Sequence, residues 1–440
     1  MSDFRTSILT WSEAKIYCSR RLSGRDENNA FDEHPGHLVG VGSQLSGAGQ
    51  ARRKTDTDTA CVQGQNKMKL QNKDHFHGSD LEKIEEVYGI RKEDIISFSD
   101  NVNPLGISRH LRESLSAHLD AITSYPDREY KELRKTIAGY IGSCPECIVV
   151  GNGSTELISL AVRVLDPKKA LLPEPTYSEY EREITLAGGE LVRCEIRKEN
   201  GFRVDVGELE KELTEGFDLL ILCNPNNPTS QAIVPDDMRR LLEICRRKNV
   251  FVMVDETYVE FVPSRGLRPG DGVTSVPLTE EFDNLLILRG TSKFFSAPGL
   301  RLGYAVTGNE ELLGKLKKLQ NPWTISSLAE MAGRLMFRDG DYIRRTREAI
   351  SRERTRVCRI LDEWKSVEYF EPSANFVLVH ILRGDVTAGD LFDHCIRQGM
   401  MIRDCSTFAY LDDSWFRFCF RTQEEDDRLL AALQEMLGQI

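Results

Sequence analysis

The sequence predicts an α/β fold with a mostly parallel central sheet and a second, smaller α+β domain. Between residues 147 and 306, short apolar runs such as Leu219–Cys223 and Val250–Val254 alternate with helical segments. Strands that are apolar on both faces are typical of a parallel sheet covered by helices on both sides. The runs Val367–Phe370, Phe376–His380 and Trp415–Phe420 are separated by polar turns and one more helix follows them, which predicts the smaller domain.

Helices are expected where apolar residues recur with a period near 3.6. The expected helices cover residues 81–88, 111–122, 130–141, 154–164, 178–187, 235–248, 310–320, 325–337, 342–364 and 424–437.

We expect four segments along the chain. Residues 1–74 are rich in polar residues and glycine, so they cannot bury enough apolar surface to offset the entropy of ordering, and we interpret them as a disordered or artefactual extension. Residues 75–116 would form an N-terminal arm and part of the small domain. Residues 117–323 would form the large α/β domain, and residues 324–440 the small C-terminal domain. Because Met68 precedes the arm, a chain that begins there is expected to keep all three of the other segments.

Composition excludes several classes of protein. The 440 residues carry a net charge of −11, which argues against a general nucleic-acid or anionic-membrane partner. No run of 18 apolar residues exists and the N-terminus lacks an apolar signal core. Eleven cysteines without a framework spacing favour a reducing, cytoplasmic location. Cys144 and Cys147 have C-x-x-C spacing, but with no second pair nearby we expect no metal site, and their role stays open.

The most informative stretch runs from Arg289 to Tyr304. An apolar run, residues 284–288, predicts a buried strand that brings Lys293 to its carboxyl end. Partial burial there would lower the pKa of the amine and make it nucleophilic. A surface lysine is the alternative for any isolated Ser-Lys pair.

Other polar residues follow neighbouring predicted strands. Asn227 lies in the turn after one strand, Asp255 and Tyr258 follow the next, and Gly153-Ser154-Thr155 leads from a strand into a helix. Because ligands of parallel sheets bind at the carboxyl ends of the strands, these residues are expected to meet in one site.

In this order the motifs resemble the fold-type I pyridoxal-phosphate (PLP) enzymes, specifically the histidinol-phosphate aminotransferase branch, from about His75 to the C-terminus. The resemblance implies that Lys293 bonds the cofactor, that Asp255 pairs with the pyridine nitrogen, and that Tyr258 and Asn227 hydrogen-bond the ring oxygen. A strand-end cap is the alternative for Asp255, and a turn residue for Asn227.

The resemblance also implies a phosphate cradle. Gly153, Ser154 and Thr155 would bind the cofactor phosphate at a helix N-terminus, with Arg301 supplying charge. Most members carry a hydroxyl residue where this chain has Gly290, so one hydrogen bond to the phosphate is either missing or made by Ser292. Tyr177 would stack on the cofactor ring, with an ordinary core tyrosine as the alternative. Tyr125 would reach the neighbouring subunit's cofactor, which implies a homodimer with shared active sites.

Within this branch, the N- and C-terminal motifs resemble the L-threonine O-3-phosphate decarboxylases of cobalamin biosynthesis. Arg417 would hold the α-carboxylate of a small phosphorylated amino acid, and His77, Asn103 and Arg403 its phosphate. Ser79 departs from the usual glycine and leaves the placement of His77 open.

This resemblance favours decarboxylation of threonine phosphate to (R)-1-amino-2-propanol O-2-phosphate. An aminotransferase of the histidinol-phosphate type is the alternative, and a non-catalytic PLP-fold regulator is the third hypothesis. Threonine phosphate and serine phosphate differ by one methyl group, worth only ~1 kcal/mol, so both remain candidate substrates.

Overall fold

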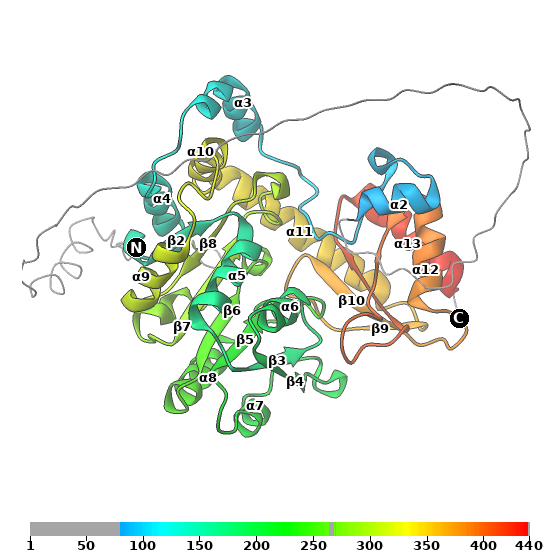
Figure 1. The fold of residues 1–440 in the computed structure, drawn as a ribbon. Coiled ribbons are helices and arrows are strands. Elements are labelled where there is room, and N and C mark those ends of the chain that lie inside the picture. The colour runs from blue at the N-terminus through cyan, green and yellow to red at the C-terminus, as the bar shows by residue number, and fades with distance from the viewer. Residues whose placement is uncertain (1–79, 264–267, 269, 439–440) are drawn as a thin grey trace, which may run out of the picture. The chain divides into compact units, whose positions relative to one another are not determined.

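The computed structural model describes residues 80–263, 268 and 270–438 (Figure 1). The predicted extension (residues 1–74) and His77 lie outside these residues.

A seven-stranded sheet forms the centre of the large domain. Its order is β2-β8-β7-β6-β5-β3-β4, and all neighbours are parallel except β8, which is antiparallel to both β2 and β7. The mostly parallel sheet predicted from the apolar runs is confirmed. The strands are β2 (Ile148–Gly151), β3 (Lys169–Glu174), β4 (Glu190–Glu195), β5 (Leu219–Cys223), β6 (Phe251–Asp255), β7 (Leu285–Gly290) and β8 (Gly303–Val306).

Helices cover both faces of this sheet because alternate residues of each central strand point to opposite sides. In β5, Leu219 and Ile221 belong to the core cluster shared with α5, α6 and α9, whereas Leu220 and Leu222 belong to the cluster shared with α8. The helices of the large domain are α3 (Arg109–Ala117), α4 (Lys131–Ile141), α5 (Gly153–Leu165), α6 (Glu179–Leu186), α7 (Val206–Glu212), α8 (Pro235–Arg247), α9 (Glu310–Leu319) and α10 (Ser327–Met336).

The small domain is built from both ends of the described chain (Figure 1). Its four-stranded antiparallel sheet has the order β12-β13-β10-β9, and a separate parallel pair joins β1 to β11. The long helix α11 connects it to the large domain in sequence. Its elements are α2 (Leu81–Tyr88), β1 (Ile96–Ser97), α11 (Gly340–Leu361), β9 (Val367–Tyr369), β10 (Phe376–Ile381), α12 (Ala388–Arg397), β11 (Met400–Met401), β12 (Arg403–Asp404), β13 (Trp415–Cys419) and α13 (Gln423–Leu437).

Several elements differ from the sequence prediction. The helix expected over 111–122 is two elements, α3 and a 3-10 turn at Leu119–Thr123. The apolar residues before β8 do not extend this strand: β8 begins at Gly303, because Leu300 closes a 3-10 turn and Arg301 has a left-handed φ of 52°. Helix α10, which lies within the predicted small domain, packs against α3 and α4. The transition between domains therefore runs along α11.

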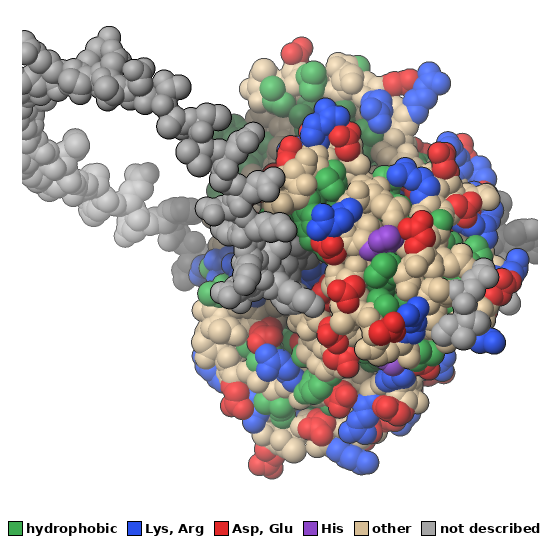
Figure 2. All heavy atoms as spheres, turned by 90° about the vertical axis from the view of Figure 1, so that its right-hand side faces the viewer, with side chains coloured by type: hydrophobic (Ala, Val, Ile, Leu, Met, Phe, Trp, Pro, Cys, Tyr) green, Lys and Arg blue, Asp and Glu red, His purple; other side chains and the backbone are tan. Residues whose placement is uncertain are grey.

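Four further features of the described residues concern membranes, metal ions, cysteines and surface charge. No helix within residues 80–263 and 270–438 combines the length and apolar character that crossing a membrane requires. In the described part of the chain, no three His, Cys, Asp or Glu side chains come together to hold a metal ion. Cys144 and Cys147 form a disulfide. Figure 2 shows charges of both signs interspersed on the face that carries the small domain, rather than a field of one sign.

Candidate active site

Lys293 lies in the turn after β7, and the N-terminal arm holds it there. Its Nζ donates to the carbonyl of Asp100 at 2.6 Å, and its own carbonyl accepts from the backbone N–H of Asn103 at 3.0 Å. Exclusion of water lowers the pKa of Lys293; nearby Asp100 raises it, and Arg417 lowers it further. The predicted lysine is thus a partly buried amine with reduced proton affinity.

Asp255 ends β6, next to Leu288 of β7 in the sheet register. Its Oδ1 accepts from the backbone N–H and the hydroxyl of Thr257, at 2.9 and 2.6 Å, and its Oδ2 accepts from the hydroxyl of Tyr180 at 2.9 Å. All three donors are neutral, and burial raises the pKa of Asp255 despite them. A buried carboxylate with only neutral donors is stabilised most in its ionised form by a cationic partner, such as a protonated pyridine nitrogen.

Tyr258 and Asn227 both present hydrogen-bond donors. The buried hydroxyl of Tyr258 accepts from Asn101 Nδ2 at 3.2 Å, and burial raises its pKa, so the hydroxyl keeps its proton at neutral pH. The Asn227 Oδ1 accepts from Arg417 Nη1, which leaves the NH₂ of the same amide to donate. The Tyr258 hydroxyl and the Asn227 amide could therefore each donate a hydrogen bond to one negatively charged oxygen.

The predicted phosphate cradle is built mainly from backbone. Gly153 begins α5 with a φ of 80°, and a Cβ there would lie 2.5 Å from Arg301 Nη2. The Arg301 guanidinium therefore lies beside Gly153 at the N-terminus of α5, where the helix dipole also attracts anions.

Gly290, the position where the family pattern expects a hydroxyl residue, lies between two hydroxyl groups. A Cβ on Gly290 would be 3.3 Å from the Oγ of Ser154 and 3.7 Å from the Oγ of Ser292. A phosphate hydrogen bond made by Ser292 is consistent with this geometry. Thr155 follows in the first turn of α5.

Tyr177 follows β3 and is half-buried. Its ring meets the ring of Tyr180 edge-on, with centroids 5.6 Å apart. Burial raises its pKa to about 12, while the charge of Asp255 adds to this and that of Arg301 opposes it. The tyrosine is thus near both the proposed pyridine partner and the phosphate cradle, as a stacking residue must be.

Arg403 and Arg417 come from neighbouring antiparallel strands of the small domain and are paired in register. Both are buried, at 8 and 4 % exposure. Arg417 Nη2 donates to the carbonyl of Ser99 at 2.6 Å, and its guanidinium lies over the ring of Phe376. Arg403 Nη2 donates to Thr407 at 2.9 Å. Among the described residues, the buried Nε of Arg417 has no hydrogen-bond partner, so this N–H is left for an anionic ligand.

Asn103 differs from its predicted role. Its Nδ2 donates to the carbonyl of Phe294 and to the hydroxyls of Tyr342 and Thr346, and its Oδ1 accepts from the Leu105 N–H. These contacts occupy the whole amide, so in this structure Asn103 fixes the arm to α11 and does not offer a contact to the substrate phosphate.

Tyr125 faces outward. It is 80 % exposed, and its ring contacts that of Trp323, 4.8 Å away. The residue is therefore available to a neighbouring subunit, and its role in trans stays a prediction.

Three contributors were not expected from the sequence. Tyr180 and Thr257 hold Asp255, and Asn101 contacts Tyr258. The Asp-x-Thr spacing was a signal for Thr257, because a carboxylate readily accepts from the residue two positions on. The contacts of Tyr180 and Asn101 depend on tertiary placement.

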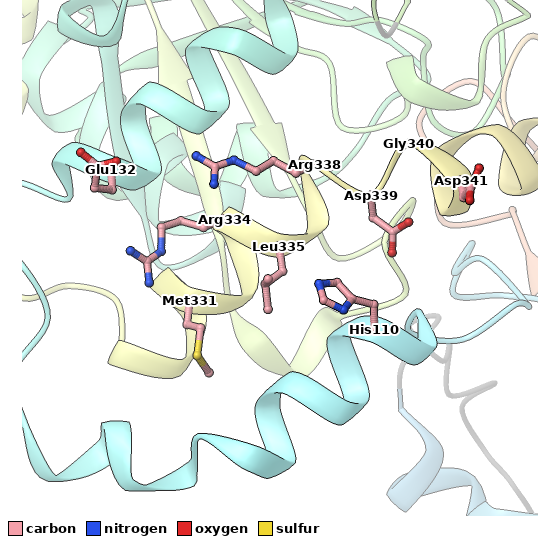
Figure 3. A pocket seen from close by; sticks show the side chains of 9 residues that line it. All are labelled: His110, Glu132, Met331, Arg334, Leu335, Arg338, Asp339, Gly340 and Asp341. Carbon is pink, nitrogen blue, oxygen red and sulfur yellow. The ribbon is translucent and has the colours of Figure 1, made fainter.

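A hollow of about 590 Å³ lies elsewhere, between α3, α4, α10 and the start of α11 (Figure 3). Arg334 and Arg338 come from α10 and the turn after it, and His110 from α3. Glu132, Asp339 and Asp341 also line it, so the charges of the arginines are balanced. None of the predicted site residues lines this hollow.

Residues 93–433 match the family model for aminotransferase class I and II. The chain belongs to this family. As a member of the aminotransferase class I and II family it uses PLP, and the basic cradle, the buried Asp255 and the amine of Lys293 fit that cofactor.

Relatives of two activities resemble this chain. A protein from Caldanaerobacter subterraneus subsp. tengcongensis, provisionally named threonine-phosphate decarboxylase, is 37 % identical over 76 % of this chain and 88 % of its own. Threonine-phosphate decarboxylase from Salmonella typhimurium is 30 % identical over 82 and 96 %. Histidinol-phosphate aminotransferase from Methanothermobacter thermautotrophicus is 31 % identical over 82 and 94 %.

Solved structures of the family share the fold. The histidinol-phosphate aminotransferase from Clostridium acetobutylicum matches with a TM-score of 0.71 and 30 % identity, over 77 % of this chain and 98 % of that one. The same enzyme from Sinorhizobium meliloti, solved with pyridoxal-5'-phosphate, matches with a TM-score of 0.70 and 22 % identity, over 81 and 94 %. The predicted fold-type I architecture is confirmed.

Proposed function

We propose that this chain decarboxylates L-threonine O-3-phosphate to (R)-1-amino-2-propanol O-2-phosphate, a step of cobalamin biosynthesis. The observation that supports this most directly is the buried, register-paired Arg403 and Arg417. Like charges placed opposite each other repel, and anions bound beside them relieve the repulsion. A phosphorylated amino acid supplies two anionic groups, a phosphate and a carboxylate.

The two arginines would decide which bond is broken. PLP, when bound, supplies an electron sink for the pair of electrons left on Cα. Arg417, which also holds Asn227, would grip the carboxylate, and Arg403 the phosphate. Two fixed anionic ends leave the substrate one orientation about Cα, and the bond that stands perpendicular to the cofactor ring is the one that breaks.

Lys293 would then complete the reaction. Loss of carbon dioxide must be followed by addition of a proton at Cα. The lowered pKa of Lys293 makes its protonated amine a better proton donor than an ordinary lysine, and its contact with the Asp100 carbonyl keeps it at the site.

An aminotransferase of the histidinol-phosphate type is the second candidate. Histidinol phosphate carries one anionic group, but a 2-oxo dicarboxylate acceptor carries two, so the arginine pair suits that acceptor as well. The identity to the Methanothermobacter thermautotrophicus enzyme, 31 %, is comparable to that of the Salmonella typhimurium decarboxylase, 30 %.

The deciding experiment supplies purified holoenzyme with threonine phosphate, serine phosphate, or histidinol phosphate plus 2-oxoglutarate. The proposal predicts carbon dioxide and aminopropanol phosphate from threonine phosphate without any 2-oxo acid. Formation of glutamate from 2-oxoglutarate without carbon dioxide would assign the aminotransferase instead. Comparing the kcat/KM of the two phospho-amino acids would measure the contribution of the methyl group.

The proposal includes a homodimer, with Tyr125 acting on the partner's site, in the cytoplasm. The exposed aromatic pair of Tyr125 and Trp323 supports it, because large exposed aromatics often mark an interface. Mixing Tyr125→Ala chains with Lys293→Ala chains tests it. If Tyr125 acts in trans, each mixed dimer regains one complete site, whereas action within one chain predicts no regain above the Tyr125→Ala parent.

A further inference from the structure

We infer that Asn101 is a positioning residue for the reaction: its side-chain amide donates to Tyr258 and thereby directs the hydroxyl proton of Tyr258 into the cofactor site. The inference rests on the PLP site and not on the choice between decarboxylase and aminotransferase.

The contact is buried and geometrically fixed. Asn101 and Tyr258 are 1 and 6 % exposed, and Asn101 Nδ2 lies 3.2 Å from the Tyr258 hydroxyl oxygen. The Tyr258 ring meets the ring of Phe376 edge-on at 4.9 Å. The hydroxyl therefore has little freedom to leave the amide.

The backbone of Asn101 is held as firmly. Its carbonyl accepts from Asn375 Nδ2 at 2.9 Å, immediately before β10. Its φ of 57° lies in the left-handed region, which asparagine tolerates better than most residues. The same arm binds Lys293 through the carbonyl of Asp100 and Arg417 through the carbonyl of Ser99. The arm thus contacts a third residue of the site, Tyr258, through the side chain of Asn101.

The chemical consequence follows from counting protons. A tyrosine hydroxyl has one proton and accepts through its oxygen. Because the Asn101 amide donates to the hydroxyl oxygen, the hydroxyl proton must point away from Asn101 and is left to meet the cofactor. The ring oxygen of PLP, which the resemblance assigns to Tyr258 and Asn227, would then receive a donor from each. Donation stabilises its negative charge and lowers the proton affinity of the nitrogen that Lys293 contributes.

The visible absorbance of the holoenzyme, titrated with pH in the absence of substrate, measures this effect. We expect Asn101→Gly and Tyr258→Phe to raise the midpoint in the same direction, by about one pH unit at most, the size that one hydrogen bond produces. Glycine keeps the left-handed backbone and removes only the amide. Asn249→Gly is the matched control, because Asn249 is exposed and has a φ of 56°; its midpoint should not move.

The double variant separates positioning from a general structural effect. In a Tyr258→Phe background, Asn101→Gly should shift the midpoint no further, since the amide acts through the hydroxyl. Additive shifts would overturn the inference. Asn101→Asp, which has the same shape but can only accept, should draw the Tyr258 proton away and raise the midpoint like Tyr258→Phe, and it keeps the test valid if the glycine variant fails to fold. A downward shift in Asn101→Gly would mean that Tyr258 donates to Asn101, the opposite orientation. Absence of any visible absorbance in the wild type would contradict the cofactor assignment and would overturn this inference with it.

Discussion

Arg403 and Arg417 lie directly opposite each other on the antiparallel strands β12 and β13, and both are buried. Polar partners hold each of them: Asn227 and the Ser99 carbonyl contact Arg417, and Thr407 contacts Arg403. The cations are therefore fixed before a substrate arrives, so binding need not order them, which favours affinity for a doubly anionic ligand.

Replacing either arginine by glutamine should impair substrate use and spare the cofactor. Each lost charge-assisted contact is expected to cost ~2–4 kcal/mol in kcat/KM, because a substrate anion would be left without its partner. Visible absorbance of the holoenzyme should stay unchanged. Arg397→Gln, at an exposed arginine of the same domain, is the control. Equal loss of cofactor in all three variants would contradict the assignment.

Gly153→Ala should weaken PLP binding. The new Cβ would lie 2.5 Å from Arg301 Nη2, in a backbone conformation with a φ of 80°. The left-handed backbone alone costs ~1–2 kcal/mol for a non-glycine residue, so the Kd for PLP should rise by about tenfold or more. Gly139→Ala in α4 is the control, since a Cβ there meets no atom within 4 Å. Equal PLP affinity in the two variants would mean that Gly153 does not form the cradle.

Lys293→Met should stabilise the cofactor-free protein, most strongly at neutral pH. The pKa of Lys293 is lowered, so the folded state holds this proton less well than the unfolded chain. The penalty is fully present below the folded pKa and disappears as the pH rises to about 10.4, the unfolded value. The gain in Tm should therefore shrink between neutral pH and that value. A gain independent of pH, or one equalled by Lys315→Met at an exposed lysine, would contradict this account.

Asp255→Asn should remove the negative charge opposite the cofactor ring while keeping the side-chain shape. We expect kcat to fall because the activation free energy rises by ~3–5 kcal/mol, the cost of leaving one member of a buried ion pair without its partner. Stopped-flow or steady-state rates at saturating PLP would measure it. Asp283→Asn, at an exposed aspartate before β7, should behave as the wild type; near-normal turnover in Asp255→Asn would exclude the proposed pairing.

The alternating apolar runs were sufficient to predict the large sheet and most helices, because burial on both faces leaves a strong signal in β5, β6 and β7. The direction of each strand could not be predicted from these runs. Strand β8 is as apolar as the parallel strands of this sheet, but it runs antiparallel to both β2 and β7, since the segment that carries Lys293 returns the chain beside β7. Helices α7 and α12 and the two-residue strands β1, β11 and β12 are too short or too mixed in composition to stand out.

The residues of the cofactor site could be predicted because they lie at the ends of strands. The residues proposed to bind the substrate could not be predicted as well, because their roles depend on where each side chain points. Asn103 shows the limit. Its place in the arm was predicted, but a buried amide takes whichever partners complete its hydrogen bonds, and here α11 supplies them. Asn101, two residues earlier, contacts Tyr258 instead. Residues two apart on an extended segment share a face, but Asn101 has a left-handed φ of 57°, so alternation could not predict which partner each asparagine contacts.

The small domain contains β1 and β11, which pair in parallel although Ser97 and Met401 are about 300 residues apart. Ribosomes add roughly 5–20 residues per second, so the arm waits some 15–60 s before its partner strand exists. By then Lys293 and Asp255 have long been synthesised, and the sheet that holds them can fold. Arg403 and Arg417, which are proposed to hold the substrate, are made later still, so a nascent chain has all its cofactor residues before it has its substrate residues.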